Sequence, residues 1–101
     1  MNLYKADIVQ SLAGHDKGEY FFVMDLTEEH VFLSDGKTRT TEHPKRKNRK
    51  HVRKAARIDS LVVSKIHSGD KVHNSELRRT LACFRQSTES ITKEVSKLGK
   101  G

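Results

Sequence analysis

Cysteine, proline and tryptophan are scarce: the 101 residues include one cysteine, one proline and no tryptophan. Because Cys83 is alone, an intramolecular disulfide is excluded, and we expect this side chain to be a small buried hydrophobe. Only 34% of the residues are hydrophobic, which predicts one small domain with a modest core.

Long apolar stretches are also missing. No run approaches the roughly 20 residues that a membrane-spanning helix needs. The N-terminal residues contain no apolar region of signal-peptide length. We therefore expect a cytoplasmic protein with no membrane partner.

Motifs of catalysis and metal binding are absent as well. The six histidines include no pair at i, i+4, so there is no local signature of a zinc site. There is no nucleophile elbow, and no glycine-rich phosphate loop that leads into a helix. We expect no enzymatic activity, no metal and no cofactor.

Acidic residues are absent from one segment that is rich in lysine and arginine. The chain has 20 basic and 13 acidic residues, a formal net charge of +7. Eight basic residues lie within residues 45–57: Lys45, Arg46, Lys47, Arg49, Lys50, Arg53, Lys54 and Arg57. The other 12 basic residues are outnumbered by the 13 acidic ones. This distribution indicates a polyanion-binding element, which we expect to be a basic arm over residues 43–57.

The first half of the chain has the pattern of β-strands. The predicted strands are residues 7–12, 19–26, 30–33, 37–41 and a short segment near 51–53. Asp35-Gly36 predicts a hairpin turn between the third and fourth strands. In the second strand, Phe21 and Val23 point away from the face that carries Tyr20 and Phe22. Both faces of this strand must therefore be buried, and we expect the C-terminal half of the chain to pack on Phe21 and Val23.

The second half has the pattern of helices. Residues 60–68 form a short helix capped by Asp59, or alternatively a hairpin through residues 68–70. A clearer helix is predicted at residues 75–86, with Asn74 as its N-cap.

In that helix, Leu77, Leu81 and Phe84 recur at i, i+4 and i+7, and we expect them to dock on Phe21 and Val23. Residues 87–101 are predicted to be a frayed tail or a short amphipathic helix.

The predicted fold class is mostly β with C-terminal helices. Several short strands joined by glycine-containing turns indicate a small closed or nearly closed barrel. We expect residues 1–58 to form this barrel together with the basic arm. Residues 59–86 would then be a helical appendage packed on it.

Residues 8–18, Ile-Val-Gln-Ser-Leu-Ala-Gly-His-Asp-Lys-Gly, resemble the KOW motif. An aromatic and aliphatic strand follows, then Asp-Gly-Lys at residues 35–37, and then the basic stretch that begins at Pro44. This order is similar to that of short KOW-domain RNA-binding proteins related to large-subunit ribosomal proteins of the fourteen-e kind. The resemblance covers residues 6–53 well and residues 74–81 more weakly.

This resemblance implies an SH3-like β-barrel and a role in RNA binding. It places Gly14 where the chain leaves the first strand, a position that favours positive φ and therefore glycine. The amides of Gly14 and Gly18 would approach the sugar–phosphate backbone, and Lys17 would pair with a phosphate. His15 stands where relatives often carry arginine, which weakens that contact near neutral pH.

We therefore predict a cytoplasmic, ribosome-associated RNA-binding protein of the translation machinery. Its RNA is expected to be structured, ribosomal RNA being the first candidate. The predicted RNA-binding residues are Gly14, His15, Lys17, Gly18, Lys37, Arg39, Lys45, Arg46, Lys47, Arg49, Lys50, Arg53, Lys54 and Arg57. Phosphate contacts and shape, rather than base edges, would dominate recognition. We expect a monomer, with a protein partner on the ribosome as an open option.

Two other interpretations remain. The barrel could be a protein-interaction module of the transcription or translation machinery. The two helices could instead be a DNA-binding helix-turn-helix, with Arg78, Arg79 and Arg85 facing DNA. Tyr4, if exposed, could stack on a base, whereas Tyr20 is expected in the core.

Overall fold

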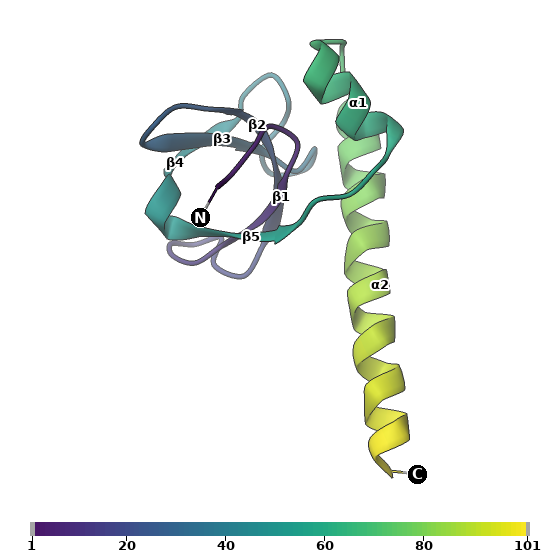
Figure 1. Ribbon diagram of the computed structural model, residues 1–101. Coiled ribbons are helices and arrows are strands. Elements are labelled where there is room, and N and C mark those ends of the chain that lie inside the picture. Colours follow the sequence, from purple (N-terminus) through teal and green to yellow (C-terminus); the bar gives the residue numbers. More distant parts are fainter. Residues whose placement is uncertain (1, 101) are drawn as a thin grey trace.

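The computed structural model describes the backbone of residues 2–100 and the side chains of residues 2–87 (Figure 1). The strands are β1 (Ile8–Ser11), β2 (Tyr20–Leu26), β3 (His30–Ser34), β4 (Lys45–Asn48) and β5 (Val52–Ala56). One turn of 3-10 helix, η1 (Arg49–His51), joins β4 to β5. Two helices follow, α1 (Leu61–Ser68) and α2 (Asn74–Lys100).

The strands form one antiparallel sheet of five strands in the order β4-β3-β2-β1-β5. The sheet curls around on itself, and both helices lie on one side of it (Figure 1). Among the described residues the two edge strands, β4 and β5, are connected through η1 and not by a ladder. The predicted β-rich architecture with C-terminal helices is confirmed, but the sheet does not close into a barrel.

Each face of the curled sheet has its own core. One cluster contains Phe21, Val23, Val31 and Leu33, with Leu3 from the N-terminal segment. The other cluster packs the opposite face of the sheet against the helices.

In this second cluster, Phe22 of β2 contacts the group that includes Ile66 of α1 and Leu77 and Leu81 of α2. The burial predicted for Leu77 and Leu81 is confirmed. The predicted docking on Phe21 and Val23 is wrong, because those side chains belong to the other cluster and the helices cover the Phe22 face.

The residues that follow Asp35 form a loop and not the predicted strand 37–41. The Asp35 carboxylate accepts hydrogen bonds from the amides of Lys37 and Arg39, both at 2.9 Å. These bonds offer the backbone an alternative to strand pairing. Pairing with β3 resumes only at Lys45, where β4 begins.

The 43–57 segment is not an arm. It contains β4, η1 and β5, so its backbone forms both edges of the sheet. Side chains alternate across a strand, so Lys45 and Lys47 point to one face of β4 and Arg46 points to the other. The sequence of this segment does not predict strand β4, because β4 contains no apolar residue whose alternation would indicate a strand.

Helix α1 forms as predicted, but Ser60 caps it instead of Asp59: its side chain accepts a hydrogen bond from the Val63 amide. Gly69 ends the helix with φ 79°. The competing hairpin is therefore wrong.

Helix α2 begins near the predicted residue but extends well beyond residue 86. The Asn74 side chain does not cap it; its Oδ1 accepts from the Thr41 amide at 2.8 Å. Glu76 reaches back to the His73 amide instead, as in one half of a capping box. Cys83, expected to be buried, is exposed on this helix. The backbone of residues 87–100 continues α2, whereas the amphipathic face proposed for residues 87–101 lies outside the described side chains.

Candidate nucleic-acid interface

Loop 13–18 connects β1 to β2 and makes a tight turn. Gly14 and Gly18 have φ values of 87° and 91°, so the positive φ predicted for Gly14 is confirmed. The Gly18 amide donates to the Ser11 carbonyl at 2.8 Å. It is therefore not available to the sugar–phosphate backbone as expected.

Asp16 anchors this loop to β4. Its carboxylate lies 2.8 Å from Lys45 Nζ and 2.7 Å from Lys47 Nζ, and it accepts a 2.7 Å hydrogen bond from Ser11 Oγ. Burial alone would raise the pKa of Asp16, but the bonds from Lys45, Lys47 and Ser11 together hold it well below its usual range. Lys47, only 8% exposed, also donates to the Ala13 carbonyl.

A second carboxylate, Asp7, holds two further cations of the 43–57 segment. It is 1% exposed and lies 2.9 Å from Arg57 Nε and 3.8 Å from Lys54 Nζ. The hydrogen bond that Arg57 donates to the Asp7 carboxylate raises the pKa of Arg57. Lys45, Lys47, Lys54 and Arg57 therefore neutralise two buried or half-buried acids, so that their charge serves the fold.

The other four cations of the segment differ in their contacts. Arg49 donates to the backbone carbonyls of Thr27 and Glu28. Arg53 donates to the Gln10 side chain at 2.9 Å. Arg46 and Lys50 are exposed, and among the described residues their side chains form no hydrogen bond or ion pair.

A groove of about 510 Å³ lies between loop 13–18, loop 35–39 and α2. Its charged lining residues are the cations Lys37, Arg39, Lys45, Arg78 and Arg85, with the carboxylates Asp16, Glu19 and Asp35; His15 also lines it. Each carboxylate already has a partner within the protein: Asp16 binds Lys45, Glu19 binds Arg85, and Asp35 binds backbone amides. The side chains of Lys37 and Arg39 are exposed at this groove.

Helix α2 positions loop 35–39 through close contacts. Arg78 Nη1 donates to the Gly36 carbonyl at 2.6 Å. Gly36 has φ 77°, and a Cβ there would overlap the Asn74 carbonyl. Only glycine combines this conformation with so close an approach. The loop that carries Lys37 and Arg39 therefore depends on α2 for its position.

The structure brings together only part of the predicted site. His15, Lys37, Arg39 and Lys45 line the groove, and Gly14, Lys17 and Gly18 lie on the same loop as His15. The remaining predicted residues do not line it: Arg46, Lys47, Arg49, Lys50, Arg53, Lys54 and Arg57.

The site prediction missed Arg78 and Arg85, which had been considered only for a helix-turn-helix. Their spacing of seven residues places them on one face of a helix. That spacing could have identified the pair, but not the loops that they face, because the docking of α2 is a long-range contact.

No group of three histidine, cysteine, aspartate or glutamate residues is arranged to hold a metal ion within the described part of the chain. No helix in that part combines the length and the apolar character needed to cross a membrane. No protein-family model matches the chain, and no curated protein matches it either.

Proposed function

We propose that this protein binds structured RNA, ribosomal RNA being the expected class, by contacting phosphates along the groove between loop 13–18, loop 35–39 and α2. The observation that carries the proposal is the convergence of Lys37, Arg39, Arg78 and Arg85 from two separate segments on one groove. Cations that converge on a groove create the positive potential that attracts a polyanion.

The KOW resemblance of residues 8–18 supports the same conclusion. In our proposal the curled sheet is an SH3-like barrel left open between β4 and β5, and loop 13–18 is its KOW loop. Lys17 extends the positive surface of the groove at this loop. Arg46, on the edge strand β4, and Lys50, in η1, are available for additional phosphates.

Recognition of RNA structure is favoured over recognition of a particular base sequence, because the exposed groups at the groove are mainly cations. Cations recognise the spacing of phosphates and carry little sequence information. The deep major groove of an RNA helix excludes side chains, so proteins recognise such helices mainly by shape. This recognition needs no metal and no bond-breaking step.

The helix-turn-helix alternative fits the contacts less well. A recognition helix presents its arginines to the DNA major groove, whereas Arg78 bonds the Gly36 carbonyl and Arg85 lies 3.5 Å from Glu19. Both arginines therefore point into the groove between α2 and the sheet, and not outward from α2 as a recognition helix requires. A protein-interaction module has no comparable support, because the groove lining is dominated by charge.

The test is the salt dependence of RNA binding. If the four groove cations neutralise four phosphates, log K falls with log salt at a slope of about −3, from roughly −0.7 to −0.9 per phosphate. Replacing Lys37 and Arg39 by glutamine should flatten this slope by about 1.5 and weaken binding to different structured RNAs by similar factors. Fluorescence anisotropy over a range of salt concentrations measures both quantities.

The matched control is the double variant Lys71→Gln and Arg79→Gln, which removes one lysine and one arginine that are exposed and do not line the groove. It should leave the slope close to that of the wild type. If the Lys37→Gln, Arg39→Gln variant kept both its affinity and its slope, the groove would not be the RNA interface. Binding that required DNA half-sites would favour the helix-turn-helix.

A further inference from the structure

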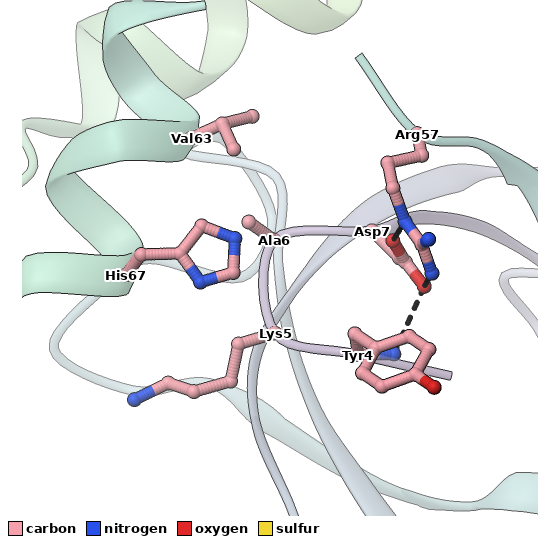
Figure 2. Close-up of a pocket in the computed structure, with 7 residues that line it drawn as sticks. All are labelled: Tyr4, Lys5, Ala6, Asp7, Arg57, Val63 and His67. Carbon is pink, nitrogen blue, oxygen red and sulfur yellow. Dashed lines mark hydrogen bonds and ion pairs between the residues drawn. The ribbon is translucent and has the colours of Figure 1, made fainter. Parts of the chain in front are cut away.

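A second hollow, of about 290 Å³, lies away from the groove, between the N-terminal turn and α1 (Figure 2). Tyr4 and Arg57 lie on one side of it, and Val63 and His67 of α1 lie on the other. Lys5 extends along its edge (Figure 2). None of these residues lines the groove proposed above to bind phosphates.

The Tyr4 ring is held in place although it is 51% exposed. The Tyr4 amide donates to Asp7 Oδ2 at 2.9 Å, and the Asp7 amide donates to the Tyr4 carbonyl at 3.1 Å. The guanidinium of Arg57 lies over the ring, 4.7 Å from its centroid. This contact is a cation–π interaction, which favours this position of the ring beside the hollow.

The turn that presents Tyr4 contains a strained residue. Ala6 has φ 72°, a left-handed conformation that L-residues other than glycine rarely adopt. Its amide donates to the Val23 carbonyl at 2.7 Å. Burial of Leu3 and Ala6 accounts for the path of the turn, which leaves the Tyr4 ring exposed beside the hollow.

The charge around the hollow is positive. Lys5 and Arg57 line it, and the only lining carboxylate, Asp7, already binds Arg57 and Lys54. Half of the Arg57 side chain is exposed in spite of this ion pair. An aromatic face beside cations is the combination by which proteins hold single-stranded nucleic acid, with the base stacked and the phosphate paired.

We propose that this hollow binds one unpaired nucleotide of the RNA, such as a bulged or terminal nucleotide. The base stacks on Tyr4, and Lys5 and Arg57 contact its phosphate. The imidazole of His67 faces the hollow from α1 (Figure 2) and is placed to donate or accept a hydrogen bond at the base edge. This inference rests on the proposed RNA binding and adds a preference for RNA that carries an unpaired nucleotide.

The test compares two RNA hairpins with the same stem, one fully paired and one with a single bulged 2-aminopurine. The wild type should bind the bulged hairpin more tightly by roughly 5- to 150-fold, the range that stacking of one base on an aromatic ring supplies. Stacking should also quench the 2-aminopurine fluorescence. Tyr4→Ala should abolish both the preference and the quenching, and Tyr4→Phe should keep both because the ring remains.

Leu61→Ala is the matched control, since Leu61 is an exposed large side chain that does not line the hollow. It should keep the preference. Thermal unfolding of each variant shows whether a loss of binding reflects a loss of fold; if Tyr4→Ala unfolds, Lys5→Gln replaces it and should lower affinity for the bulged hairpin more than for the paired one.

Equal wild-type affinity for the two hairpins, with the salt slope intact, would overturn this inference and leave the proposed function standing. Failure to bind either hairpin would overturn the proposed function itself. A preference for the bulged hairpin that survived Tyr4→Ala would place the unpaired nucleotide elsewhere. If an acidic peptide displaced the bulged nucleotide from the wild type but not from Tyr4→Ala, the hollow would be assigned to a protein partner. That result would also overturn this inference.

Discussion

The Nζ of Lys47 lies 2.7 Å from Oδ1 of Asp16, and this ion pair joins β4 to loop 13–18. Lys45 binds the other carboxylate oxygen at 2.8 Å. Two cations that would be assigned to nucleic acid on charge density alone are therefore bound to a carboxylate of the protein. Loop 13–18 and the basic segment are therefore parts of one structural unit.

The first prediction concerns the pH dependence of this unit. The pKa of Asp16 is lowered in the folded protein, so its stabilising effect is full above the unfolded pKa of about 3.9 and is lost as the pH falls below that value. Asp16→Asn should lower the free energy of unfolding by about 1.5–3 kcal/mol at pH 7, the range for a hydrogen bond to a charged group. The difference from wild type should shrink below about pH 4.

Urea unfolding of both proteins at several pH values measures this difference. A gap that stayed constant from neutral to strongly acidic pH would show that the ionised carboxylate of Asp16 does not stabilise the fold.

The second prediction compares two pairs of cations from the same segment. Lys45→Gln with Lys47→Gln removes both cations that bind Asp16, and should cost about 3 kcal/mol because a mostly buried charge loses its partners. Arg46→Gln with Lys50→Gln makes the same change in net charge at exposed positions. It should change stability by no more than about 0.5 kcal/mol. Equal melting temperatures for the two double variants would refute the structural role of the Asp16 cluster.

The third prediction uses two glycines with nearly the same backbone conformation. Gly36 has φ 77° and Gly69 has φ 79°, but only at Gly36 would a Cβ overlap another residue, the carbonyl of Asn74. Gly69→Ala should cost about 1–2 kcal/mol, the penalty of the left-handed conformation alone. Gly36→Ala should cost about 1–3 kcal/mol more, because the loop or α2 must move. Similar costs at the two sites, measured by thermal unfolding, would show that loop 35–39 does not depend on contact with α2.

The fourth prediction tests the docking of α2 on the sheet. Leu81 is 1% exposed in the core between the sheet and the helices, whereas Leu61 of α1 is 69% exposed. Leu81→Ala should lower the free energy of unfolding by about 2–5 kcal/mol. Leu61→Ala, the same chemical change at the surface, should lower it by less than about 0.5 kcal/mol. Wild-type stability for Leu81→Ala would mean that α2 does not share the core.

The division of the chain into a β-rich first half and a helical second half could be predicted from local patterns. Apolar residues at spacings of two and of three to four are properties of short windows, and they survive in almost any tertiary context. The burial of Leu77 and Leu81 could be predicted for the same reason. The positive φ of Gly14 could be predicted from the resemblance of residues 8–18 to the KOW motif, together with the conformational freedom of glycine. The strand expected at residues 37–41 failed because the Asp35 side chain satisfies the amides that a strand would have paired.

Which face of β2 meets the helices could not be predicted. Phe21 and Phe22 are equally apolar neighbours, and the alternation along the strand only requires that they point in opposite directions. The curl of the sheet encloses Phe21, and α1 and α2 cover Phe22. That choice depends on how the whole sheet coils.

The sequence by itself determined where the positive charge of this protein is concentrated, because charge is a property of the residues and not of their arrangement. Only the tertiary structure decided what that charge does. Lys45 and Asp16 are 29 residues apart in the chain, and Arg57 and Asp7 are 50 apart. Such pairs form when distant segments of the chain meet, so only the folded structure shows which cations remain exposed and are available for the proposed RNA binding.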